Sequence, residues 1–242
     1  MRGCLFTLLL GAIVIVLVVV VGLPAVASAV LTGGITAAGL QAEDTTVTVA
    51  SDPPTDLLGL HADRVRVRAT RATFRGLEIG RLDVTLRDVA IVDRTAGSVD
   101  GSLRDVTVPD IGGRSLALAE ITLAGGAEAV TASTTIDGAD AETLLADAVA
   151  GELGTRPSAV TLAAPDRVAV RIGVVVHGRL SVSAAGDLVA EVLDGPEAGR
   201  TVVLLHAGRD LPIRLTSVRV TDAGDLRLTG DLAIGLLGPT GG

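Results

Sequence analysis

Residues 64–69 read RVRVRA and residues 81–87 read RLDVTLR, and these two stretches decide the fold. In both, apolar residues alternate with charged or polar ones. This is the period of a β-strand that buries one face and exposes the other to water. The exposed face of the first stretch consists of arginine alone. The two stretches therefore predict neighbouring strands of a half-buried sheet.

The alternation changes phase at three further places along the chain. The apolar positions shift by one residue between Leu86 and Val89, between Leu118 and Ile121, and between Leu215 and Val218. Such a shift is typical of a β-bulge, which inserts one extra residue into one strand and bends it. Repeated bulges curve a sheet. We therefore expect a strongly curled antiparallel sheet.

The rest of the chain also shows strand patterns, with turn residues between them. Turn chemistry at Asp222–Asp225 predicts a hairpin over residues 218–228. Further strands are predicted at 128–136, 159–164, 166–176, 179–185, 188–194, 201–206 and 225–234.

One long amphipathic helix is predicted from Ala139 to Leu153. Asp137 is its expected N-cap, and Gly151 or Gly154 its expected end. The apolar residues recur at helical spacing and should lie against the sheet: Ala141, Leu144, Leu145, Ala148 and Val149. A shorter helical turn is expected at residues 54–60. The fold class expected is α+β, with the curled sheet wrapped around the helix.

The N-terminus is predicted to be a hydrophobic helix that inserts into a membrane. No charge interrupts Leu5–Val21, which is long enough to span the hydrocarbon layer. Arg2 precedes it, so the positive-inside bias places the rest of the chain outside the cytoplasm. Pro24 and the small residues up to Ala29 resemble a signal-peptidase site. Residues 1–29 are thus either a retained anchor or a signal peptide cleaved near Ala29.

The remaining chain divides into three expected parts. Residues 30–44 are small and Gly/Ala-rich, which indicates a linker. Residues 45–236 are expected to form one α+β domain, and residues 237–242 a Gly-rich tail. The predicted location is outside the cytoplasmic membrane, either anchored to its outer face or released into the periplasm-like envelope space.

Composition excludes several classes of function. The net charge is −8 and aromatic residues make up 1% of the chain, so it lacks the basic surface and stacking groups of a nucleic-acid-binding protein. Cys4 is the only cysteine, which rules out an intramolecular disulfide and a cysteine zinc site. Because Cys4 precedes the hydrophobic run, it is also misplaced for a lipoprotein anchor.

No motif for catalysis, metal or cofactor binding is present. His61, His177 and His206 stand apart without metal-ligand spacing, and no nucleophile elbow or phosphate-binding loop occurs. We therefore expect no enzyme activity and no cofactor. A hydrolase would require one of these histidines to meet carboxylates in the folded chain.

Five arginines form a stripe that begins in the stretch 64–69 and continues just beyond it: Arg64, Arg66, Arg68, Arg71 and Arg75. Two readings are open. The stripe either meets anionic lipid head groups near a membrane, or is the wet face of a strand whose acidic neighbours lie opposite. The second reading is favoured.

Four stretches, in this order, resemble the LmeA-like phospholipid-binding family of exported, chiefly actinobacterial envelope proteins: VTVASDPPTDLLGLHADRVRVRAT (47–70), FRGLEIGRLDVTLRDVAIV (74–92), LALAEITLAGGAEAVTASTTIDGADAETLLADAVAG (116–151) and LPIRLTSVRVTDAGDLRLTGDL (211–232). The resemblance covers roughly residues 45–234. It implies half of a tubular lipid-binding (TULIP-like) domain, with an apolar groove and no catalytic motif.

The predicted function is non-catalytic binding of a phospholipid or another acyl lipid in the cell envelope, for lipid handling or envelope assembly. The alternative is an envelope scaffold or protein-interaction module with a dry core. Groove candidates come from the apolar phase of the strands and helix: Leu82, Val84, Leu86, Leu144, Leu145, Ala148, Val149, Val168, Val170 and Ile172.

Overall fold

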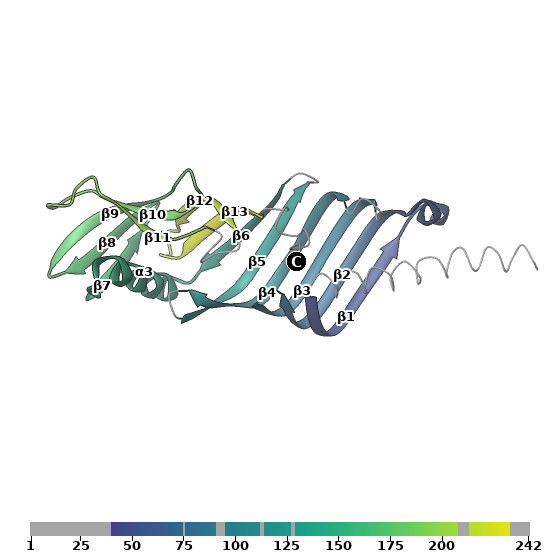
Figure 1. Cartoon of the computed structure of the whole chain (residues 1–242), viewed down its shortest axis with the longest axis horizontal. Coiled ribbons are helices and arrows are strands. Elements are labelled where there is room, and N and C mark those ends of the chain that lie inside the picture. The colour runs from purple at the N-terminus through teal and green to yellow at the C-terminus, as the bar shows by residue number, and fades with distance from the viewer. Residues whose placement is uncertain are drawn as a thin grey trace, which may run out of the picture.

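The computed structural model of the chain describes residues 40–74, 76–90, 95–111, 114–126, 129–207 and 213–232. These residues form two antiparallel β-sheets, one α-helix and one short 3-10 helix (Figure 1). The predicted hydrophobic N-terminal helix and the Gly-rich tail lie outside the described residues. Within the described residues, no helix has both the length and the hydropathy needed to cross a membrane.

The larger sheet has eight strands and extends along the long axis of the molecule. Its order is β1-β2-β3-β4-β5-β6-β13-β12, so the last hairpin of the described residues lies beside β6. Its strands are β1 (Leu40–Ala50), β2 (His61–Phe74), β3 (Leu77–Ala90), β4 (Thr95–Ile111), β5 (Arg114–Gly126), β6 (Val130–Ile136), β12 (Arg214–Val220) and β13 (Leu226–Leu232). The 3-10 helix η2 (Pro54–Gly59) joins β1 to β2 at one end of the molecule.

The smaller sheet lies with the α-helix at the other end of the molecule (Figure 1). Its order is β11-β10-β9-β8-β7, and β12 of the larger sheet lies beside its strand β9. Its strands are β7 (Ala159–Ala163), β8 (Arg167–Ile172), β9 (Val174–Val182), β10 (Leu188–Val192) and β11 (Thr201–Leu205).

Helix α3 runs from Gly138 to Leu153, as its apolar spacing predicts. The side chain of Asp137 accepts a hydrogen bond of 3.0 Å from the backbone N–H of Ala139 and so caps the first turn. Gly154 ends the helix in the left-handed region, at φ 67°. The apolar side of the helix packs against β7 and β11 of the smaller sheet.

Alternation places the side chains of the larger sheet on two chemically distinct faces. Along β2, Val65, Val67 and Ala69 are buried, whereas the arginines between them lie on the opposite face. Because antiparallel partners share a face, the register extends this division across the sheet. One face is therefore aliphatic from β1 to β5, and the other is polar.

The phase shifts in this sheet are shared by paired strands. Ala69 pairs with Leu82 and Ala72 pairs with Ile79, so the register stays constant although both strands change phase between these pairs. Arg71 adopts a φ of 47° at this level, which rotates the strand so that the following side chains change face. The same occurs on β4, where Asp105 has a φ of 53°.

The prediction of a strongly curled, half-TULIP-like sheet wrapped around a long helix is wrong. The sheet is open, because a phase shift shared by both partners inserts no extra residue into either strand. True shifts of register occur between Leu215 and Ser217 on β12 and between Val108 and Ile111 on β4. The described fold is mostly β-sheet, and its helix is short and packs on the smaller sheet.

Two clusters of buried side chains stabilise the described residues. The larger cluster includes Leu145 and Val168 and joins α3 and the smaller sheet to the adjoining part of the larger sheet. The smaller cluster, which includes Leu57 and Val65, lies under η2, β1 and β2. Apolar burial of this kind contributes roughly 25 cal/mol per Å² of surface removed from water.

Candidate functional site

A patch of half-buried aliphatic side chains lies on the apolar face of β3, β4 and β5. We call this patch the central panel. Its members are Leu82, Val84, Leu86, Val99, Leu103, Ile121 and Leu123. Leu82 pairs with Leu103, which pairs with Ile121, so this row of the panel crosses three strands on one face. Over three strands and five residues the panel covers roughly 10 Å by 13 Å.

The central panel borders both buried clusters but is less covered than either. Leu82 packs against both clusters, and Leu86 packs against the smaller one. Val84, Val99 and Leu123 pack against neither cluster. The panel is therefore apolar surface that the described packing leaves partly uncovered.

Gly101 lies in the middle of the panel, between Val84 and Leu123. A Cβ at this position would lie 2.6 Å from the carbonyl oxygen of Asp83, so only glycine allows β3 and β4 to approach this closely. Because glycine has no side chain, the surface of the panel at its middle row lies closer to the backbone than at the leucine row beside it.

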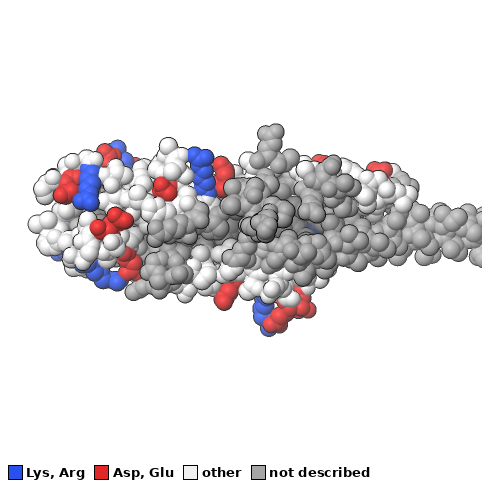
Figure 2. All heavy atoms as spheres, viewed as in Figure 1, with Lys and Arg blue, Asp and Glu red and all other residues white. Residues whose placement is uncertain are grey.

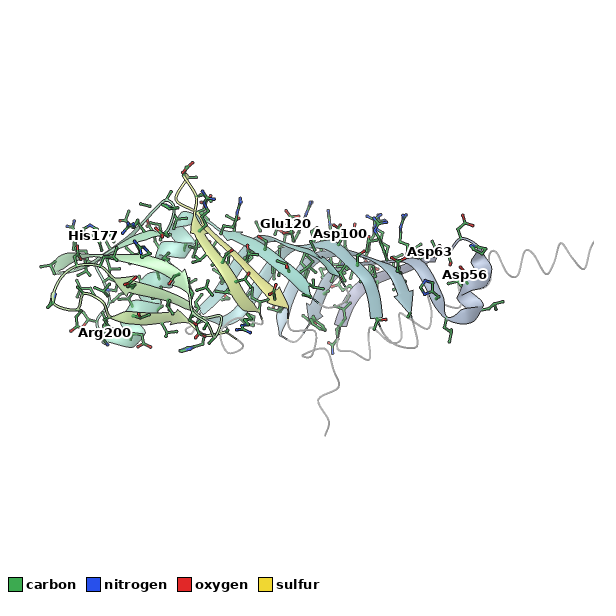
Figure 3. All side chains as sticks on the ribbon, turned by 90° about the horizontal axis from the view of Figure 1, so that it is seen from above. Asp56, Asp63, Asp100, Glu120, His177 and Arg200 are labelled. Carbon is green, nitrogen blue, oxygen red and sulfur yellow. The ribbon has the colours of Figure 1, made fainter. Side chains whose placement is uncertain are left out.

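The opposite face of the same strands is held by ion pairs. Arg66 donates two hydrogen bonds to Asp83, from Nε at 2.8 Å and from Nη2 at 2.7 Å. These hydrogen bonds, with the charges of Arg66 and Arg68, hold the pKa of the Asp83 carboxyl below its ordinary value. Figure 3 shows Asp100 and Glu120 on this polar side of the sheet.

The arginine stripe therefore has acidic partners on neighbouring strands. Arg68 Nε lies 3.4 Å from Asp83, and Arg71 forms an ion pair with Glu43 on β1. This is the wet-face reading favoured by the sequence. Arg75 lies outside the described residues.

The predicted groove residues separate into two groups. Leu144, Leu145 and Val149 of α3 and Val168 of β8 are buried, with at most 9% of their surface exposed. The half-buried Ala148, Val170 and Ile172 pack against the same cluster. These seven residues are part of a packed core. By contrast, the other three, Leu82, Val84 and Leu86, lie on the central panel.

Sequence reasoning missed four members of the panel: Val99, Leu103, Ile121 and Leu123. A signal for two of them was present, because residues 98–104 read SVDGSLR and alternate as β3 does. The glycine within this stretch and the absence of a second hydrophobic run obscured the strand.

Two of the three histidines meet a carboxylate, as a hydrolase would require, but each of these carboxylates also accepts a hydrogen bond from a backbone N–H. His177 Nδ1 lies 2.6 Å from Asp194 Oδ2, and the backbone N–H of His177 donates to Asp194 Oδ1 at 2.8 Å. These two hydrogen bonds, the backbone one first, lower the pKa of Asp194. His206 Nδ1 is 3.9 Å from Asp187, which also accepts hydrogen bonds from Ser183 and Ala207. Both carboxylates thus stabilise the ends of strands through hydrogen bonds.

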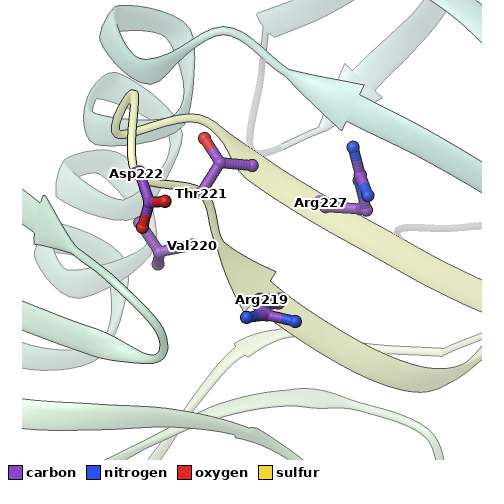
Figure 4. Close-up of a pocket in the computed structure, with 5 residues that line it drawn as sticks. All are labelled: Arg219, Val220, Thr221, Asp222 and Arg227. Atoms are coloured by element: carbon purple, nitrogen blue, oxygen red, sulfur yellow. The ribbon is translucent and has the colours of Figure 1, made fainter.

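No metal site is apparent either, since the described residues include no group of three or more potential ligands. A concavity of about 190 Å³ lies at the β12–β13 hairpin (Figure 4). Its lining includes three charged side chains, those of Arg219, Asp222 and Arg227. It is therefore unsuited to an acyl chain.

The described residues thus form an open β-sheet with one aliphatic, partly uncovered face and one charged face. The chain belongs to the LmeA-like phospholipid-binding family, whose model matches residues 18–231. No curated protein and no solved structure matches it.

Proposed function

We propose that the chain binds the acyl chains of phospholipids on the central panel, without catalysis. The observation that carries this proposal is the half-burial of the panel in a chain of a phospholipid-binding family. The core around α3 offers no comparable surface, since its aliphatic side chains are already packed together.

The energetics of such a site are favourable. Each methylene moved from water onto an apolar surface contributes about 0.8 kcal/mol, so about ten methylenes contribute about 8 kcal/mol before the costs of association. Several kcal/mol of that total are spent on ordering the ligand, which leaves reversible binding. Reversibility suits a protein that receives and releases lipid.

We further propose that this binding takes place outside the cytoplasmic membrane. The support is the uncharged stretch Leu5–Val21 with Arg2 before it, which is typical of export. If this stretch stays in place, the sheet is tethered near the outer face of the membrane. Cleavage near Ala29 instead releases a diffusing carrier into the envelope space.

The test is uptake of a fluorescent acyl probe, with native mass spectrometry of the purified chain for retained lipid. Leu123→Asp places a charge on the panel and should weaken probe binding about tenfold or more. Ala124→Asp is the matched control, because Ala124 is the next residue of β5 and faces the polar side. It should bind the probe as the parent chain does.

Circular dichroism must show that both variants fold, and Leu123→Thr supplies a milder change that should weaken binding less. Equal probe binding by Leu123→Asp and Ala124→Asp would exclude the panel as the site. Absence of both retained lipid and probe uptake in the parent chain would exclude the function.

The second candidate is an envelope scaffold that pairs with another protein through the same panel. The packed core around α3 favours it over a lipid-filled interior. In that case the parent chain takes up no acyl probe, and Leu123→Asp instead abolishes association with the partner.

A further inference from the structure

The exposed large apolar side chains of the described residues lie at the two ends of the molecule. Leu58 is 65% exposed and Leu60 is 48% exposed, both at η2. At the other end, Val174 is 66% exposed, Val175 43% and Leu153 42%. Figure 1 shows η2 and the β8–β9 hairpin at opposite ends of the long axis.

The second group converges on the tip of the β8–β9 hairpin. Ile172 pairs with Val174 around Gly173, whose φ of 73° makes the tight turn. The start of β7 pairs with the end of β8, because Ala159 lies opposite Arg171. This brings the end of α3, and with it Leu153, to the same end of the smaller sheet.

The two ends differ in charge. The chain carries a net charge of −8, yet residues 167–186, which include the whole β8–β9 hairpin, contain no acidic residue. In the neighbouring loop between β10 and β11, Asp194 is bonded to His177 and Glu197 is paired with Arg200, so this loop adds no unpartnered carboxylate beside the tip. Arg171, next to the tip, is exposed and forms no ion pair with any described residue. Its guanidinium is therefore available to an external anion.

The η2 end is acidic instead. Leu58 and Leu60 lie among three aspartates that outnumber the adjacent Arg64, namely Asp52, Asp56 and Asp63. Figure 3 shows Asp56 and Asp63 at this end and His177 at the other. An anionic surface would be repelled here, whereas at the β8–β9 tip the unpaired Arg171 can contact it.

We infer that the β8–β9 tip docks into an anionic phospholipid bilayer. Val174 and Val175 enter the acyl layer, and Arg171 contacts head-group phosphates. Aliphatic side chains bordered by a cation match the interface of a membrane, which is apolar inside and anionic at its surface. The inference rests on the proposed lipid-binding function and adds the surface through which the protein reaches its source of lipid.

The chain contains no tryptophan, so one introduced at the tip is a unique fluorophore. The full chain carrying Val174→Trp is mixed with vesicles of phosphatidylcholine and phosphatidylglycerol whose acyl chains are brominated. The tryptophan emission should shift to shorter wavelength and be quenched. The matched control, Leu58→Trp, should keep the emission of a solvated tryptophan.

Arg171→Gln in the Val174→Trp chain should weaken vesicle binding about fivefold, since one arginine near an anionic surface contributes on that order. With phosphatidylcholine alone, the same substitution should change nothing. Neither substitution touches the central panel, so acyl-probe uptake should stay at the parent level, which separates docking from lipid binding.

Three results would overturn the inference. The first is unquenched emission from Val174→Trp in the presence of bound vesicles. The second is equal quenching of Leu58→Trp, which would show unselective contact. The third is a wavelength shift that depends on protein concentration without vesicles, because that outcome indicates pairing of two copies through the tip.

Discussion

Asp83 is a single residue on the polar face of the sheet whose contacts stabilise the strand that carries the apolar face. It lies on β3 between Leu82 and Val84, so its side chain and theirs project from opposite faces of one strand. The hydrogen bonds from Arg66 tie β2 to β3 on the polar side. The panel therefore keeps its shape through contacts that no ligand on the panel would disturb.

Asp83→Asn should lower the Tm at neutral pH by no more than about 3 °C, because 35% of the Asp83 side chain is exposed. The pKa of Asp83 is lowered in the folded chain, so this stability is present above the ordinary pKa of the carboxyl. It is lost as the pH falls through the lowered value. The difference between parent and variant should shrink below about pH 4.

Thermal unfolding followed by circular dichroism across this pH range is the measurement. Asp100→Asn is the control, because Asp100 lies on the same face and forms no ion pair with a described residue. Its effect should be smaller at neutral pH. A difference between parent and Asp83→Asn that grows toward acid pH would contradict the assignment.

At the scale of the strand, the shared phase shift is the feature that determines the shape of the sheet. Arg71, Gly80 and Asp105 lie level with one another on β2, β3 and β4, between pairs that keep their register. Each strand rotates at this level, so the residues on its apolar face change from odd to even numbers. The sheet therefore stays open while its apolar face continues to the larger cluster.

Gly80→Ala should destabilise the chain by about 1–3 kcal/mol, because the added Cβ would lie 2.7 Å from Cβ of Asp105. Urea unfolding followed by circular dichroism measures the loss. Gly59→Ala is the matched control, since nothing lies within 4 Å of its added Cβ. If the two variants are equally stable, the close approach of β3 and β4 at this level is not required.

At the scale of the whole molecule, the described residues separate stability from the proposed binding. The packed core around α3 lies at one end with the smaller sheet, whereas the central panel lies further along the larger sheet (Figure 1). In the view of Figure 2, acidic and basic side chains are interspersed at the α3 end. Changes in the core and in the panel should therefore have different consequences.

Leu145→Ala should cost about 2–5 kcal/mol of unfolding free energy, because Leu145 is only 1% exposed and its removal leaves a cavity. The affinity for an acyl probe should stay within about twofold of the parent value, since Leu145 belongs to the packed core and is not a member of the central panel. Urea unfolding and probe titration are measured on the same preparation. A loss of affinity as large as that of Leu123→Asp would indicate that the lipid binds at α3 and not on the central panel.

The sequence by itself determined which residues face inward and where the helix lies. The alternation at 64–69 and the spacing of Ala141, Leu144 and Leu145 depend on local periods of 2 and 3.6 residues, and both predictions are confirmed. The family was also readable, because its pattern runs through nearly the whole chain.

Only the tertiary structure decided how the sheet is shaped and which apolar side chains stay partly uncovered. A phase shift reads the same in sequence whether one strand bulges or two partners turn over together, and register between distant strands distinguishes the two. Periodicity likewise gives the face of a residue but not what covers it. Leu145 and Val84 both lie on the apolar side of their element by sequence period, yet the helix is packed onto a second sheet and the panel is not.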